Sequence, residues 1–254
     1  MIVKRMMFAV GIVLIAAVAG FAQTKPGTLA SLEFQKLKPG TAKQYEDGRK
    51  AQADWHKQQK DPVPLMVWET ISGDDSGTYI VGRLGQHWAD LDVPPAQDKA
   101  ELEAYEKNVG VYVESLITRY YELMPKDSKP TDSMAPTKFS EIITYVVKSG
   151  KEEEFHSAIT RATEAIDKTK WPVHYYWYEL VNGGRAGTYV LVIPHDKWAD
   201  FEDNPNMKPF AEMLNEAFGH AEAASILNRF DTSTESDTSS ILEYRPDLSY
   251  LPGK

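Results

Sequence analysis

The sequence nearly repeats itself at a spacing of 110 residues. GTYIVGRLGQHWADLD at residues 77–92 returns as GTYVLVIPHDKWADFE at residues 187–202. Displacing the chain by this spacing aligns residues 32–123 with residues 142–233 without a gap, and seventeen of the aligned pairs are identical. Because the identical pairs include Gly, Pro and Trp in step, the pattern indicates a tandem duplication.

Each copy predicts the same order of elements. In the first copy a short strand and a Gly turn precede a long helix, and β-rich runs follow at residues 63–71 and 77–83. A helical region begins near residue 88, and a last strand covers residues 115–123. The order β-α-β-β-α-β is the ferredoxin-like split unit. Since neither face of the hairpin strands is polar, the two sheets are expected to bury their open faces against each other.

The stretch VVKSGKEEEFHSAI, followed by a hairpin and a Gly-Thr-Tyr strand, resembles the dimeric α/β-barrel superfamily, and within it the NIPSNAP-like and stress-responsive barrel domains. The resemblance covers residues 30–123 and 140–231. It implies an α+β fold in which two tandem ferredoxin-like βαββαβ units pack sheet to sheet as an intramolecular dimeric α/β-barrel. That superfamily includes cofactor-free monooxygenases, haem-degrading enzymes, chlorite dismutase-like haem proteins and members without known activity, so the resemblance does not select a reaction.

Three segments lie outside the two copies. Residues 124–139 are interpreted as a linker that is rich in Pro, Ser and Asp, and residues 232–254 as a C-terminal tail. The run DTSTESDTSS at residues 231–240 is taken as a polar exit from the second copy. Two alternatives stay open for the rest of the tail: it docks on the barrel, or it is a half-ordered terminus. Docking would use Ile241, Leu242, Tyr244 and Leu248.

Residues 1–22 have the layout of a secretory signal peptide, with Lys4 and Arg5 ahead of an uncharged stretch that ends in small residues. Cleavage near Gln23 predicts a periplasmic or secreted protein without stable membrane insertion, and an uncleaved anchor is the alternative. Without these residues the chain has 26 Lys+Arg against 37 Asp+Glu, a formal charge of −11. Such an acidic chain makes a nucleic-acid partner improbable, and with no Cys the fold depends on its core alone.

The two copies differ most along their first helix. In the second copy, apolar residues recur there at helical spacing, whereas the matched positions of the first copy are mostly polar. The apolar set is Phe155, Ala158, Ile159, Ala162 and Ile166, and the matched set is Tyr45, Gly48, Arg49, Gln52 and His56. Either the first helix lies loosely at the surface, or it covers a polar pocket with Gly48 opening space beside it. We take Tyr45, Arg49, Gln52 and His56 as candidate ligand-binding residues.

Repeated charges and aromatics give weaker signals. Glu69 and Arg119, with their counterparts Glu179 and Arg229, are charges inside otherwise apolar strands. Glu69 and Arg119 join the candidate ligand-binding set, although a structural role at strand ends or at the barrel rim is favoured because both copies keep the charge. The repeated pairs Tyr79/Tyr189 and Trp88/Trp198 are expected in the core.

No reaction follows from the remaining motifs. The six His residues show no metal-binding spacing, so no metal site and no cofactor are predicted. Haem stays a minor alternative, with His56 or His220 as its axial ligand. Catalytic residues and oligomeric state are left open. Two hypotheses result: a non-catalytic barrel that is structural or binds a small apolar or aromatic molecule, or a cofactor-free monooxygenase or haem-dependent enzyme.

Overall fold

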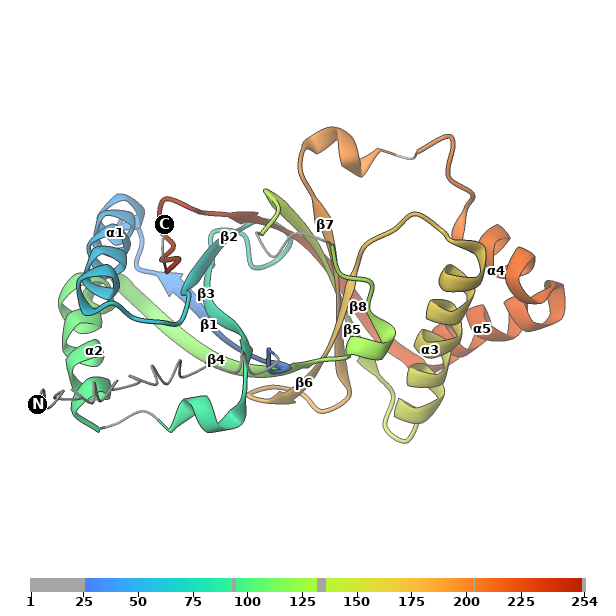
Figure 1. The fold of residues 1–254 in the computed structure, drawn as a ribbon, viewed down its shortest axis with the longest axis horizontal. Coiled ribbons are helices and arrows are strands. Elements are labelled where there is room, and N and C mark those ends of the chain that lie inside the picture. The colour runs from blue at the N-terminus through green and yellow to red at the C-terminus, as the bar shows by residue number, and fades with distance from the viewer. Residues whose placement is uncertain (1–25, 93–94, 132–135, 203, 253–254) are drawn as a thin grey trace, which may run out of the picture.

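A computed structural model describes residues 26–92, 95–131, 136–202 and 204–252 (Figure 1). The predicted signal segment, residues 1–22, lies outside these residues. Within the described ranges, no helix combines the length and the apolar character needed to cross a membrane.

Two successive sets of elements follow one another along the chain. The first half contains β1 (Leu29–Leu37), α1 (Ala42–Gln59), β2 (Met66–Ser72), β3 (Tyr79–Gln86), the 3₁₀ turn η1 (Trp88–Leu91), α2 (Pro95–Asn108), η2 (Gly110–Tyr112) and β4 (Val113–Leu123). The second half contains η3 (Pro125–Asp127), β5 (Phe139–Val147), α3 (Glu152–Thr169), β6 (Tyr176–Asn182), β7 (Thr188–His195), η4 (Trp198–Phe201), α4 (Phe210–Phe218), α5 (His220–Ser233) and β8 (Thr234–Tyr244).

The strands form one closed antiparallel barrel in the order β1-β3-β2-β8-β5-β7-β6-β4. Each half contributes four neighbouring strands, and the halves are joined where β2 pairs with β8 and β4 pairs with β6. Helices α1 and α2 flank one side of the barrel, and α3, α4 and α5 flank the opposite side (Figure 1). The barrel closes its sheet through these two inter-half pairings.

The hairpin strands are apolar on both faces because each face is buried by a different layer. In β2, Val67 packs with the α1 side, whereas Met66 and Trp68 face the barrel interior. The interior mixes side chains from both halves, such as Phe34 with Ile142. The sequence-based expectation that the two sheets bury their open faces together is therefore confirmed.

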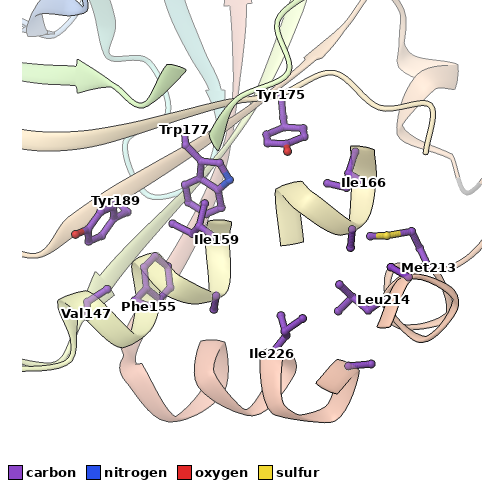
Figure 2. Close-up of a cluster of buried hydrophobic side chains, with 14 residues drawn as sticks. Val147, Phe155, Ile159, Ile166, Tyr175, Trp177, Tyr189, Met213, Leu214 and Ile226 are labelled. Carbon is purple, nitrogen blue, oxygen red and sulfur yellow. The ribbon is translucent and has the colours of Figure 1, made fainter. Parts of the chain in front are cut away.

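Helix α3 covers the second half with an apolar face. Phe155, Ile159 and Ile166 are almost fully buried there, and they pack on Trp177 of β6 and on α4 and α5 (Figure 2). Burying one such side chain contributes about 1.5–3 kcal/mol relative to leaving it exposed. The cluster between the first-half strands and helices is smaller, and Tyr45 and Leu248 belong to it.

The 110-residue spacing does not extend to the end of the second half. It relates η1 to η4, but β4 begins at Val113 and β8 at Thr234, a spacing of 121. The extra residues lie in α4 and α5, which take the place of the single helix α2. The assignment of residues 231–240 as a polar exit, within a tail at 232–254, is therefore wrong for residues 234–244. These residues are β8, which pairs with β5 and β2.

Two further expectations need correction. Arg119 lies on β4 and Arg229 on α5, so the two arginines are not counterparts. Trp88 and Trp198 lie on the short turns η1 and η4 and are about half exposed, at 48% and 55%, rather than in the core. Tyr79 and its partner in the repeat, Tyr189, are buried as expected.

Candidate functional site

The polar face of α1 is buried. Tyr45, Arg49, Gln52 and His56 are each no more than 2% exposed. The alternative of a helix lying loosely at the surface is therefore wrong. Gly48 does not open space beside them, because a Cβ there would lie 1.8 Å from the backbone oxygen of Asn108. The glycine instead allows α1 and α2 to approach closely.

A chain of hydrogen bonds links α1 to β1 at the first turns of the helix. The Tyr45 hydroxyl donates to Oε1 of Gln35 over 2.8 Å, and Nε2 of Gln35 donates to Oε2 of Glu33 over 2.7 Å. Burial raises the pKa of the Glu33 carboxyl, despite the nearby charge of Arg49. Glu33 therefore holds its proton to a higher pH than a carboxyl in water.

At the other end of the buried face, His56 is held by a carboxylate. Its Nδ1 lies 2.9 Å from Oδ2 of Asp61, which orients the ring with Nδ1–H as the donor. Its Nε2 has no hydrogen-bond partner among the described residues and lies 3.7 Å from Oε1 of Glu101. Arg83 bridges the two carboxylates, at 3.3 Å from Asp61 and 2.9 Å from Glu101.

Burial lowers the pKa of His56, and the charge of Arg83 acts in the same direction, while Glu101 and Asp61 oppose them. A neutral imidazole that donates from Nδ1 carries a lone pair on Nε2. The pair of His56 and Asp61 is thus arranged as a base whose free nitrogen is buried and unpartnered.

Arg49 has no hydrogen bond and no ion pair with any described residue, although it is 2% exposed and its Nε is buried. The other arginine of this region, Arg83, has two carboxylate partners. Burying an ion without a partner costs several kcal/mol even after the protein relaxes. The guanidinium of Arg49 is therefore a positive charge that lacks a direct counter-ion within the described chain.

Gln52 lies between these two groups on α1. Its Oε1 accepts a hydrogen bond from Nδ2 of Asn108 in α2, over 3.3 Å. The buried polar cluster is defined here as Glu33, Gln35, Tyr45, Arg49, Gln52, His56, Asp61, Arg83 and Glu101.

Glu69 and Arg119 occupy different places from the buried polar cluster. Glu69 lies on the α1 side of β2, where its Oε2 accepts from Arg245 over 2.8 Å. The same Arg245 binds Glu46 of α1 over 2.7 Å. Arg119 lies over the ring of Phe34, 4.7 Å from its centroid, and Phe34 packs among the residues of the barrel interior. The structure thus brings together Tyr45, Arg49, Gln52 and His56, places Glu69 beside them in a surface ion-pair group, and leaves Arg119 on the other face of the sheet.

The sequence comparison missed several members of the cluster that the same comparison could have found. At the 110-residue spacing, Glu33, Gln35 and Arg83 match apolar or aromatic residues of the second copy, namely Ile143, Tyr145 and Ile193. Each is a polar residue of the first copy where the second copy is hydrophobic, as on the helix. Asp61 and Glu101 carry no such signal, because Asp61 precedes a strand in a loop and Glu101 lies on α2, where the spacing fails.

The residues present do not fit a haem. His56 could coordinate an iron only through Nε2, because Asp61 binds its Nδ1. The side chain is fully buried, its Nε2 lies 3.7 Å from Oε1 of Glu101, and it lines neither of the two described hollows, so no room for a porphyrin lies beside it. His220 is exposed at the start of α5, outside any described pocket. Among the residues that the structure describes, no group of three or more His, Asp or Glu is placed to hold a metal ion.

Solved structures with the same fold include an anthrone oxidase-like protein, a proposed monooxygenase and a chlorite dismutase. The chain is similar to an anthrone oxidase-like protein, with 11% identity, a TM-score of 0.53, and 90% of this chain and 94% of that chain covered. It is also similar to a proposed monooxygenase from Lactobacillus acidophilus, with 10% identity, a TM-score of 0.52, and coverage of 89% and 97%. A mutant chlorite dismutase from Candidatus Nitrospira defluvii matches with 9% identity, a TM-score of 0.52, and coverage of 88% and 93%.

No protein-family model matches the sequence, and the search of curated proteins finds no match. At these identities the likeness shows the fold alone. It is an α+β fold of the dimeric α/β-barrel type, in which the two halves of this single chain together form one closed eight-stranded sheet.

Proposed function

We propose that this protein binds a small aromatic molecule with an anionic group, and that the binding site is the buried polar cluster under α1. The unpartnered guanidinium of Arg49 carries this proposal, because a ligand carboxylate or phenolate would supply its missing counter-ion. Gln52 and the free Nε2 of His56 would hydrogen-bond other polar atoms of the ligand. The rings of Tyr45 and His56 would contact its apolar part.

The second half supports the same location by contrast. At the positions of Arg49, Gln52 and His56 it carries Ile159, Ala162 and Ile166. Ile159 and Ile166 fill the space between α3 and its strands (Figure 2), and Ala162 is buried beside them on the same helix. One half of the barrel has therefore kept polar groups at a cost in stability where the other half is packed with apolar groups, which favours a role in binding.

A cofactor-free oxygenase is the second candidate, and the pair of His56 and Asp61 favours it. A neutral imidazole with its Nε2 free is suited to removing a proton from a phenol or an activated C–H group. Dioxygen would then be the co-substrate of the resulting anion. The proposed monooxygenase and the anthrone oxidase-like protein that share the fold support this candidate only by analogy.

Binding of benzoate tests the first candidate. Titration calorimetry at millimolar benzoate is expected to give one site per chain, and Arg49→Met is expected to abolish it. Ile159→Met, the matched substitution in the second half, should leave binding unchanged. Equal binding by wild type and Arg49→Met would contradict the proposal.

Oxygen uptake tests the second candidate. Anthrone, an activated C–H acid, is expected to cause oxygen consumption above the buffer rate with wild-type protein and not with His56→Asn. The purified protein should show no Soret band, because the described histidines do not fit a haem. Equal oxygen consumption by both proteins would remove the catalytic candidate and leave the binding proposal standing.

We also propose that the protein is exported and that its halves are ferredoxin-like units produced by duplication. The signal-like pattern of residues 1–22 supports export, and mass spectrometry of the native protein would test it by locating the N-terminus near Gln23. The equivalent strand orders β4-β1-β3-β2 and β8-β5-β7-β6 support two ferredoxin-like units. No role with nucleic acid is proposed for so acidic a chain.

A further inference from the structure

The chain segment after β8 covers the buried polar cluster. We call residues 245–251 the strap. The strap lies along α1, where Arg245 pairs with Glu46, and along the edge of β2; Figure 1 shows the red end of the ribbon beside α1. Its backbone bonds to β2 and the residue before it: the Arg245 amide donates to the Val67 oxygen, and the Tyr250 amide to the Leu65 oxygen, each over 2.8 Å.

Two strap side chains reach the cluster. Leu248 is 1% exposed and packs in the same hydrophobic group as Tyr45. The ring of Tyr250 stacks on His56 at an interplanar angle of 20°, and its hydroxyl donates to the Asp61 backbone oxygen over 2.6 Å. The strap therefore contributes to the complete burial of the proposed base.

A surface hollow marks the border between the strap and α1. It has a volume of about 530 Å³ and is lined on α1 by Lys50, Asp54 and Lys57 and on the strap by Asp247 and Tyr250. The two lysines of this lining are balanced by its two aspartates, and Lys50 lies 3.8 Å from Asp247 across the border. The hollow stops at Tyr250, and behind that ring lies His56.

The strap is fastened at its start by ion pairs at the surface. Nη1 of Arg245 lies 2.7 Å from Glu46 on α1 and 2.8 Å from Glu69 on β2, and Asp247 of the strap lies 3.8 Å from Nζ of Lys50 on α1. The carboxylates are 26–46% exposed, so solvent screens these pairs and each contributes modestly. Such contacts can break without unfolding of the barrel.

We propose that the strap is the gate of the cluster: a ligand reaches Arg49 and His56 when residues 245–251 swing away from α1, and the Arg245 ion pairs set how often this happens. The role of this movement in ligand entry rests on the proposed binding function. The movement itself does not depend on a ligand. Helix α2 is the alternative gate, since it contributes Glu101 and Asn108 to the same space. The strap is favoured because its Tyr250 lines the surface hollow on one side and stacks on His56 on the other.

Diethyl pyrocarbonate measures the opening without a ligand, since it modifies neutral imidazoles that solvent can reach. The intact protein is modified and then digested, and the modification rate at each histidine is followed by mass spectrometry of the peptides. Exposed His220 serves as the internal reference for the reagent concentration. Arg245→Gln is expected to raise the rate at His56 about 3- to 10-fold, as the loss of partly exposed ion pairs allows. The rate at the less accessible His195 should not change. Arg185→Gln, which breaks the exposed pair with Glu235 in the second half, is the matched control and should change neither rate.

The inference is overturned if Arg245→Gln leaves the His56 rate at the wild-type value, or raises His195 equally. Hydrogen exchange of the wild-type protein gives a second readout. The Tyr250 amide, bonded to Leu65, should exchange before the amides of residues 101–108 in α2. Earlier exchange of α2 would assign the gate to that helix instead.

Benzoate kinetics separate the gate from the proposed function. If the binding proposal and the gate are both correct, Arg245→Gln raises the association and dissociation rates of benzoate by the same factor and leaves Kd within about twofold. The reason is that benzoate passes through the same open state when it enters and when it leaves. If benzoate does not bind, the binding proposal fails for this ligand class, and the His56 modification rates still decide whether the strap opens.

Discussion

Replacing Arg49 by Met should stabilise the protein. The substitution keeps an unbranched apolar side chain in the buried site and removes a guanidinium that has no direct partner among the described residues. An unpaired buried ion carries a penalty of several kcal/mol, and exchanging buried charges for apolar groups of similar volume has a typical gain of about 1–4 kcal/mol. For a barrel of this size, each kcal/mol raises Tm by about 2–4 °C. The expected gain is thus about 2–16 °C.

Urea and thermal unfolding measure this gain, and pH supplies an internal check. Burial already raises the pKa of Glu33, and losing the neighbouring positive charge raises it further. At neutral pH, Glu33 is ionised in the unfolded chain but tends to stay protonated in the folded variant. Folding must then take up a proton, and this becomes less favourable as the pH rises. The advantage of Arg49→Met should therefore be largest near pH 5 and shrink toward pH 8.

The matched substitution in the second half is the control. Ile159 occupies the position of Arg49 on α3 and is fully buried, so Ile159→Met should cost less than about 1.5 kcal/mol. A loss of more than about 1 kcal/mol in Arg49→Met would refute the reasoning. It would mean that the guanidinium is well solvated in the folded protein.

Three other substitutions test separate parts of the structure. In urea unfolding, the free energy of unfolding of the wild type should fall more steeply from pH 7 to pH 5 than that of His56→Asn. Burial lowers the pKa of His56, so in this pH range its imidazole takes up a proton mainly in the unfolded chain. Leu248→Ala should cost about 2–5 kcal/mol in the same assay, against at most about 0.5 kcal/mol for Leu102→Ala, whose side chain is 52% exposed. Gly48→Ala should cost about 1–3 kcal/mol in thermal unfolding, because the added methyl would lie 1.8 Å from the Asn108 oxygen; equal or higher stability would contradict the close packing of α1 on α2.

The fold was predictable from the sequence wherever residues of the same type recurred in both copies at the 110-residue spacing. Gly, Pro and aromatic residues in step located the two hairpins, and apolar residues on both strand faces predicted a buried barrel. The prediction failed at β8, where TESDTSS is polar and pairs with β5 alone. The side chains from Glu235 to Ser239 are exposed on both faces of the strand, so no alternation of hydrophobicity could reveal it. SILNRFDTS, aligned with strand residues by the fixed spacing, is helical in α5.

The candidate site was predictable as far as one helix. Comparing the copies found the buried polar face of α1 because Arg49 and His56 replace isoleucines. The partner of His56, Asp61, lies in a loop without periodicity. The strap has a counterpart after β4, where the Met124 amide donates to the Trp177 oxygen and the Lys129 amide to the Tyr175 oxygen, but the two segments are 121 residues apart and not 110. Contacts between segments as distant as Tyr250 and Asp61 depend on the closed barrel, and a local sequence pattern does not contain them.

Barrel closure also constrains when the protein can fold during its synthesis. The edge of β2 in the first half stays unpaired until β8 is synthesised. About 170 residues separate the two paired strands, as the hydrogen bond between Ser72 and Ile241 illustrates. Every other strand leaves the ribosome before β8 does. The nascent chain must therefore carry an open sheet edge for most of its synthesis, and such edges are where chains associate wrongly. A factor that holds nascent chains would act on this protein chiefly by shielding β2.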